Sequence, residues 1–548
     1  MKRKALSLIS LLLLLTIISS SFALAAQEAP DAWRAKVDPW VLNTATQGET
    51  EFIVFLAQQA NISGAEALQS KLEKGRFVFE ALTQTADATQ GPVLDTLQTA
   101  GVEHRPYWIA NMIWVRGGIG AVEAMARRSD VAHVYANPTV HFDEPVSQGD
   151  SAAAPASPSV IEWNITKVNA PSVWAAGFTG QGAVVAGQDT GYQWDHPALK
   201  GKYRGWDGST ASHDYNWHDS VHSGGGVCGA NSLFPCDDTN HGTHTMGTMV
   251  GDDGLGNQIG MAPGAKWIGC RNMDQGNGTP TTYSECYQFF IAPTTIAGTN
   301  PDPSKAPDAI NNSWSCPVSE GCTDPNVMLT IVNNVRAAGI VTVHSAGNSG
   351  SACSTVSDPS AIYDASTSVG ATTSTDAIAS YSSRGPVTVD GSNRLKPDIS
   401  APGSNIRSSY PGGTYQGGWS GTSMAGPHVA GLVALLISAR PDLAGNVDAI
   451  ENTIEQSAVH LTSTQTCGGV PGSQIPNNPF GYGRLNALAM YQVLCPYNVN
   501  GLSGVDIVDV QLVAGAFCTN VPAYDFNHDN IVDVADIIIV AGQWMVGC

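Results

Sequence analysis

The feature that most constrains the fold is the alternation of short apolar strands with helices and Gly-rich turns from Val160 to about Leu494. Glycine makes up 58 of the 548 residues. Without a period of three, this excess indicates tight turns rather than collagen. Strands that alternate with helices pair as a parallel sheet with helices on its faces. We therefore expect an α/β domain over residues 151–494.

Two further units flank this domain. Residues 26–150 show strand and helix patterns in β-α-β-β-α-β order, the ferredoxin-like arrangement, and so predict an α+β unit. Pro145–Pro158 is rich in Ser, Ala, Pro and Gly, as exposed linkers are. Residues 495–548 contain a tandem repeat, because residues along 497–515 recur without a gap along 524–542.

The start of the chain points to export. Basic residues at 2–4 precede an apolar run through 11–18, and a small-x-small site follows at 23–25. This pattern predicts a secretory signal peptide over residues 1–25. An uncleaved membrane anchor is the alternative, since the apolar stretch is nearly long enough to span a bilayer. The net charge of −21 argues against binding to nucleic acid or, once the signal is removed, to a membrane surface.

Cysteine usage agrees with export. All 11 cysteines lie from Cys228 onward, in the part that would be the mature protein. The spacing of Cys228 with Cys236, and of Cys316 with Cys322, predicts local loop disulfides, and the remaining connectivity stays open. The odd count leaves at least one thiol unpaired or intermolecular, and we expect a buried free cysteine.

Four segments of the α/β domain carry candidate catalytic groups. An apolar strand ends at Asp189, a His-Gly-Thr-His segment carries His241, and a Gly-Thr-Ser-Met-Ala-Gly segment that opens an apolar helix carries Ser423. A neutral imidazole can take the proton of a serine hydroxyl, and a buried carboxylate fixes the imidazole tautomer. A buried strand that ends in Gly-Asn adds Asn348, whose side-chain N–H can donate to a developing oxyanion.

With these motifs, residues 160–492 resemble the subtilisin-like serine proteases, the subtilases, and most closely their bacillopeptidase F type. Three further stretches match in the same order, at 258–267, 310–314 and 396–403. The resemblance implies a parallel sheet flanked by helices. It also implies that the ferredoxin-like unit is an inhibitory propeptide.

Residue by residue, the resemblance implies that Asp189 orients the base His241, that Ser423 attacks the substrate, and that Asn348 stabilises the oxyanion. It also implies a strand that pairs with the substrate backbone, as in β-augmentation. The implied substrate-binding residues are Asn312, Ser313, Trp314, Ser315 and Gly347. The P1 pocket would lie between this strand and the small residues 349–351 that follow Asn348, which suggests a roomy pocket.

Several other residues invite a functional interpretation but have simpler ones. His244 and His428 are expected to pack or to form hydrogen bonds in the core, and Asp195-His196 to sit in an ordinary loop. The insertion before His241 carries three histidines that form either a metal site or a solvated loop. These histidines are His213, His218 and His222. The insertion departs from compact subtilisins, so the sequence does not predict the structure of the cleft rim or the substrate preference.

The repeat tail resembles dockerin-type calcium loops. Its second copy has oxygen ligands at loop positions 1, 3, 5, 9 and 12, with a backbone carbonyl expected at position 7. The implied ligands are Asp525, Asn527, Asp529, Ile531, Asp533 and Asp536. The first copy has Leu502 at a ligand position and should bind calcium weakly or not at all. A structural Ca²⁺ and a cohesin-like partner are the expectations, and an acidic cap without metal is the alternative.

These observations predict a secreted, extracellular serine endopeptidase that acts on proteins or peptides and needs no cofactor for its chemistry. It would be made as a zymogen that cleaves itself between about Phe142 and Val160 and is inhibited by its own propeptide. The alternatives are a catalytically silent scaffold or adhesive protein that uses the calcium-binding tail and, more narrowly, an exopeptidase.

Overall fold

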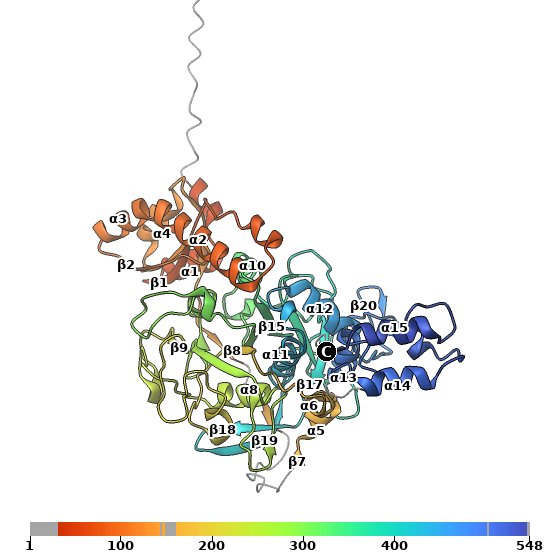
Figure 1. Ribbon diagram of the computed structural model, residues 1–548. Helices are drawn as coiled ribbons and strands as arrows, with labels where there is room; N and C mark the ends of the chain where they lie inside the picture. The colour runs from red at the N-terminus through yellow and green to blue at the C-terminus, as the bar shows by residue number, and fades with distance from the viewer. Residues whose placement is uncertain (1–30, 143–144, 148–159, 501–503, 545–548) are drawn as a thin grey trace, which may run out of the picture.

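The computed structural model describes residues 31–142, 145–147, 160–500 and 504–544 (Figure 1). The predicted signal peptide, most of the predicted linker and Leu502 lie outside the described residues. The described chain forms an N-terminal α+β domain, a larger α/β domain and a small helical tail, and Figure 1 places the first and the last at different ends of the α/β domain.

The α/β domain is built on a seven-stranded sheet in the order β17-β16-β15-β14-β8-β11-β9. All neighbouring strands of this sheet are parallel, which confirms the predicted fold class. The strands are β8 (Val184–Asp189), β9 (Trp217–Asp219), β11 (Lys266–Arg271), β14 (Ala309–Asn312), β15 (Val341–Ser345), β16 (Thr367–Thr372) and β17 (Ile399–Pro402).

Helices cover both faces of the sheet because successive strand residues point to opposite sides. Val185 belongs to one hydrophobic cluster and Ala186 to the other. The first cluster includes α8 (His241–Val250), α11 (Thr422–Ala439) and α13 (Ala487–Leu494), and the second includes α9 (Pro280–Ile291) and α10 (Leu329–Ala337). Of the described helices, α11 alone has the length and apolar composition to cross a membrane, and it is fully buried inside the fold.

The N-terminal domain has a four-stranded antiparallel sheet in the order β2-β3-β1-β4. With its helices, the chain order is the β-α-β-β-α-β arrangement expected from the sequence, except that one helix precedes the first strand and two helices follow it. The elements are α1 (Pro39–Ala45), β1 (Thr50–Leu56), α2 (Lys71–Thr89), α3 (Gly91–Thr99), β2 (Glu103–Tyr107), β3 (Met112–Gly117), α4 (Ile119–Ala126) and β4 (Val131–Ala136).

The N-terminal domain and the α/β domain share a hydrophobic cluster. Ile53 and Val78 of the first domain belong to the same cluster as Phe290 and Ile331 of α9 and α10. An ion pair of 2.5 Å between Lys71 and Asp308 lies beside this contact. The two domains therefore bury apolar surface against each other, which stabilises each in the presence of the other.

Two short strands connect the N-terminal domain to the α/β domain. β5 (Val140–His141) pairs antiparallel with β13 (Asn277–Gly278), which forms a hairpin with β12 (Met273–Asp274). β6 (Val146–Ser147) pairs antiparallel with β19 (Thr414–Ser420), directly before α11.

The tail contains α14 (Ile507–Gly515) and α15 (Val534–Gly542), each opened by a capping box. The two copies pack on each other around five buried apolar side chains, four of which form two pairs of equivalent positions in the repeat. These side chains are Val505, Val513, Ala516, Val532 and Val540. Asn530 has φ of 72°, as expected for the turn position where Gly is usual.

The cysteines are mostly paired. Cys228–Cys236 and Cys316–Cys322 are bonded as the spacing predicts, and Cys270–Cys286 and Cys353–Cys467 are bonded too. Cys495 is also in a disulfide. Among the described residues, the free thiol belongs to Cys518 and is exposed, so the expectation of a buried free cysteine is wrong. The reason is that the small tail has little interior in which a thiol can be buried.

Candidate active site

Asp189 and His241 meet at the carboxyl end of the central strand. Asp189 is the last residue of β8, and His241 is the first residue of α8. The distance from His241 Nδ1 to Asp189 Oδ1 is 2.7 Å, and both side chains are almost completely buried. Asp189 also accepts hydrogen bonds from Thr190 N (2.8 Å) and Thr245 Oγ1 (3.2 Å). These contacts fix the carboxylate, which in turn fixes the imidazole with Nε2 available.

Ser423 lies at the start of α11, in the first turn of the helix. Ser423 is 6% exposed, and its backbone carbonyl accepts a hydrogen bond of 3.2 Å from Ser313 Oγ. His241 Nε2 is buried and makes no hydrogen bond within the described parts of the chain. The nitrogen is therefore free to accept a proton. Hydrogen bonds between a catalytic base and the group it deprotonates are often long in the free enzyme and tighten when substrate binds.

Asn348 follows β15 and faces the same helix start. Its Oδ1 accepts hydrogen bonds of 2.9 Å from both Thr422 N and Thr422 Oγ1. With the oxygen engaged, the Nδ2 donor is left for another acceptor. This amide orientation suits a donor to an oxyanion that forms next to Ser423.

A pocket opens beside Ser423. Ser313, Trp314, Ser315, Gly347 and Asn348 line it. Its other lining residues are Ser345, Asp358, Pro359, Ala361, Thr422 and Ser423.

One sequence-based expectation about this pocket needs correction. Residues 349–351 do not line the pocket, whereas Asp358, which was not singled out from the sequence, does. The wall is formed later in the connection between β15 and β16 and not by the residues directly after Asn348.

The side chain of Asn312 is used inside the sheet. It is fully buried in β14, where its amide accepts from Gln188 and donates to Val343 O. It does not line the pocket, and its place in a strand that pairs with the substrate backbone stays a prediction.

The neighbouring histidines are core residues. His244 stacks on Trp419 with ring centroids 4.4 Å apart, and burial together with the nearby His241 lowers the pKa of His244 to about 3. His428 bonds Asn164 and the carbonyl of Met424. Burial lowers the pKa of His428 to about 4. Both imidazoles stay neutral, as the packing interpretation predicts.

His196 has a local structural role. It caps a short helix through Ala198 N and also bonds the carbonyl of Thr414. It therefore does not join the catalytic groups.

The three histidines of the insertion do not share one solvated loop, because two of them contact a buried carboxylate. His218 and His222 both bond the buried Glu285, at 2.8 and 2.9 Å, and Tyr107 of the N-terminal domain donates to the same carboxylate at 2.7 Å. Burial opposes ionisation of Glu285, but the two histidines outweigh it and hold its pKa far below the usual range. His213 instead bonds Tyr203. The sequence could not show this cluster, because its members come from three distant segments.

Five of the six predicted calcium ligands lie in the loop before α15, and Asp536 lies in the first turn of that helix. The Asp525 carboxylate accepts from the backbone of Asp529 and Asn530, at 3.1 and 2.7 Å. Asp536 is fully buried and accepts from Phe526 N and Asp533 N. Asn527 and Asp533 lie in the same turn, and Ile531 is exposed there. Within the described residues, no group of three or more His, Cys, Asp or Glu is arranged to hold a metal ion.

A histidine held by a buried carboxylate, on a helix packed against the helix that carries the serine in its first turn, is an arrangement found in serine hydrolases. Residues 180–483 match the model of the Subtilase family. The chain belongs to the subtilase family, whose members are serine endopeptidases.

Individual relatives agree with this assignment. The chain is 37% identical to bacillopeptidase F of Bacillus subtilis (strain 168) over 446 residues, which is 78% of this chain but 29% of that protein. It is 30% identical to subtilisin E of the same organism over 411 residues, 75% of this chain and 91% of that protein. M-protease of Shouchella clausii (strain KSM-K16) is 29% identical over 346 residues, 62% of this chain and 74% of that protein.

Proposed function

We propose that this chain is a secreted serine endopeptidase made as a self-processing zymogen. In the proposed organisation, residues 1–25 are a signal peptide, 26–150 an inhibitory propeptide, 151–494 the peptidase domain and 495–548 a dockerin-like module. The observation that carries the activity is the 2.7 Å contact of His241 with Asp189, which leaves His241 Nε2 unpaired near the α11 start.

The proposed reaction passes through an acyl-enzyme. His241 takes the proton of Ser423 as the hydroxyl attacks the scissile carbonyl, and Asp189 stabilises the imidazolium that forms. Asn348 Nδ2 and the backbone N–H of Ser423 stabilise the oxyanion. One such side-chain donor contributes about 3–4 kcal/mol, a magnitude measured on a subtilisin. His241 then gives the proton to the leaving amine, and water releases the acyl group by the same steps.

Substrate would bind as an extended strand beside Ser313–Ser315, and its P1 side chain would enter the pocket at Ser423. Gly347 and Trp314 line that pocket. The Trp314 ring is held by Tyr283, stacked at 3.9 Å. Backbone pairing makes few demands on side chains, which suits an endopeptidase.

The zymogen proposal rests on how the chain leaves the N-terminal domain. β5 pairs with β13, and β6 pairs with β19, the strand that leads into Ser423. The Phe142 ring lies 5.0 Å from the ring of His241, and Phe142 N donates to Gly276 O at 3.0 Å. A chain that lies against the catalytic histidine and pairs with the strand before the nucleophile would block other substrates, which supports cleavage between Phe142 and Val160.

Replacing Ser423 with Ala tests the activity. We expect the purified variant to stay uncleaved between Phe142 and Val160 and to leave casein intact. A fluorophosphonate probe should label the native chain at Ser423. Processing and casein cleavage by the variant would refute the nucleophile, and a native chain that neither reacts with the probe nor cuts casein would favour a silent scaffold. Cleavage of internal bonds in an end-blocked peptide separates endopeptidase from exopeptidase.

Secretion follows from the basic and apolar start of the sequence, and the disulfides suit an extracellular protein. The expected result is recovery of the protein from the growth medium with residues 1–25 removed, by N-terminal sequencing. Retention of these residues in a membrane fraction would instead support an anchor.

Calcium is proposed for the second tail copy because its donors are carboxylate and amide oxygens, which Ca²⁺ prefers. Asp525, Asn527, Asp529, Asp533 and Asp536 would hold the ion and order the loop. In the structure, both carboxylate oxygens of Asp525 and of Asp536 accept from loop N–H groups, so an ion would use their remaining lone pairs or replace some of these hydrogen bonds. A calcium-dependent rise in the thermal transition of the tail, absent in D529A, tests this. A cohesin-like partner is proposed for the same module.

A further inference from the structure

The carboxylate of Asp237 joins the loop after β8 to the start of helix α8. Its Oδ1 accepts from Thr190 Oγ1 (2.8 Å), Thr239 N (3.2 Å) and Asn240 N (2.8 Å). Its Oδ2 accepts from Thr243 N (2.9 Å) and Thr243 Oγ1 (2.5 Å). Hydrogen bonds to a charged group are the strong ones, so five donors on one carboxylate make a firm junction.

This junction is one residue away from the catalytic pair. Thr190, which donates to Asp237, also donates through its backbone N to Asp189 Oδ1 (2.8 Å). The Thr190 hydroxyl in turn accepts from Gly242 N (3.0 Å), next to His241. Any shift of Asp237 therefore moves both partners of the 2.7 Å contact between Asp189 and His241.

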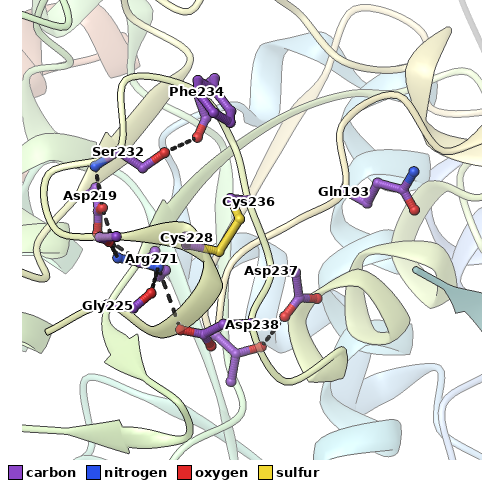
Figure 2. Close-up of a disulfide and its surroundings, with 12 residues drawn as sticks. Gln193, Asp219, Gly225, Cys228, Ser232, Phe234, Cys236, Asp237, Asp238 and Arg271 are labelled. Atoms are coloured by element: carbon purple, nitrogen blue, oxygen red, sulfur yellow. Dashed lines mark hydrogen bonds and ion pairs between the residues drawn. A yellow bond between two sulfur atoms is a disulfide. The ribbon is translucent and has the colours of Figure 1, made fainter. Parts of the chain in front are cut away.

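A disulfide fixes the segment that carries Asp237. Cys236 precedes it and is bonded to Cys228. The carbonyl of Cys236 accepts from Tyr192 N (3.2 Å), and Asp237 forms a β-bridge with Gly191. Figure 2 shows Asp237 directly beyond the Cys236 end of the disulfide. The backbone of Asp237 is thus attached to the loop after β8 as well as to the disulfide.

A fully buried arginine holds the other side of the disulfide loop. Arg271 donates twice to Asp219, at 3.0 Å each, and contacts Asp238 at 3.5 Å. It also bonds the carbonyl of Gly225, just before the disulfide loop (Figure 2), and the carbonyl of Gly229 inside the loop. In the β8–β11 pairing, Arg271 lies opposite Asp189. The contacts of Arg271 therefore hold the disulfide loop from β11, which pairs with the strand that carries Asp189.

We propose that Asp237 is a positioning residue for Asp189 and His241, and that the Cys228–Cys236 disulfide and Arg271 keep it in place. The proposal rests on the proposed function, because it concerns the efficiency of the same site. Asp237 does not touch the reacting atoms. Its hydrogen bonds fix the position of Asp189, which orients the imidazole of His241, relative to helix α8, which carries that imidazole.

The main test compares Asp237→Asn with the native chain in steady-state peptide hydrolysis, with active sites titrated by a fluorophosphonate. An amide cannot accept at both positions, so we expect kcat to fall 10- to 100-fold while KM stays within threefold. The acid limb of the kcat/KM profile should move to lower pH, because a loosely held Asp189 stabilises the imidazolium of His241 less. Asp237→Glu should restore part of kcat.

Asp207→Asn is the matched control. Asp207 also accepts several hydrogen bonds in a loop, from Ser209 and Thr210, but it is exposed. Its kcat should stay within twofold of the native value. The Cys228→Ala/Cys236→Ala variant should lower kcat with the same shift of the acid limb, and an unchanged profile would overturn the role of the disulfide.

An Asp237→Asn variant with native kcat, or with reduced kcat but an unmoved acid limb, would overturn the proposal. If that variant yields no titratable sites, Thr190→Val carries the test, since it removes the hydroxyl that joins Asp237 to Asp189. A native chain that neither reacts with the probe nor cuts peptides would refute the proposed function instead.

Discussion

The interaction between Tyr107 and Glu285 gives a sharp prediction about inhibition by the N-terminal domain. Tyr107 is 2% exposed and donates to Glu285 Oε2 at 2.7 Å. In Tyr107→Phe, this hydrogen bond is lost while the ring keeps its packing. A hydrogen bond to a charged group contributes about 1.5–3 kcal/mol, and every 1.4 kcal/mol is a factor of ten in affinity. The cleaved N-terminal domain should therefore bind about 10- to 150-fold more weakly.

The assay follows the onset of peptide hydrolysis after the processed complex is diluted, because in the proposed zymogen activity appears as the N-terminal domain dissociates. Tyr135→Phe is the control. Tyr135 lies in the same domain and packs edge-on against Phe55, and its hydroxyl has no hydrogen bond among the described residues. The reasoning is refuted if the Tyr107 variant releases its inhibitory domain at the native rate, or no faster than the Tyr135 variant.

Three further predictions concern the peptidase domain. Asn348→Ala should lower kcat about 10²- to 10³-fold, measured with a peptide substrate at saturation, and a loss below threefold would exclude the oxyanion role. Asp358→Asn should lower the ratio of kcat/KM for P1 Lys over P1 Glu peptides about tenfold, because it removes a negative charge from the pocket, and an unchanged ratio would place the carboxylate outside P1 recognition. Burial opposes protonation of His222, but the hydrogen bond and charge of Glu285 raise its pKa. The resulting stabilisation is present below the unfolded histidine pKa and lost as pH rises through the higher folded value. Urea unfolding of the Ser423→Ala chain should therefore show stability falling across that range, and His222→Gln should remove this fall.

The sequence predicted what depends on short-range patterns. Asp189, His241, Asn348 and Ser423 each lie at the end of a strand or the start of a helix. Parallel strands bring their carboxyl ends to one edge, so these positions could be inferred from local motifs. The alternation in the N-terminal domain and the repeat in the tail were equally local, and both units have the expected elements.

Contacts between distant segments were not predictable in this way. Glu285 lies in a helix without a motif, and only the docked N-terminal domain brings Tyr107 to it. Asp358 lies in the irregular connection between β15 and β16, whose path back to the pocket follows no sequence pattern. Asn312 looked like part of a substrate strand, but its side chain is used inside the sheet. In each case, the tertiary packing decides which face a polar side chain meets.

The small interior of the tail has a consequence for the lifetime of the molecule. Five buried apolar side chains hold its two helices together, far fewer than support the α/β domain, so the tail depends on a bound ion or on a covalent link such as the disulfide of Cys495. An opened segment tethered to a protease is exposed to cleavage at high local concentration. With the proposed calcium site empty and this disulfide reduced, the chain would therefore lose its tail by its own proteolysis, and either link alone would prolong the life of the full-length form.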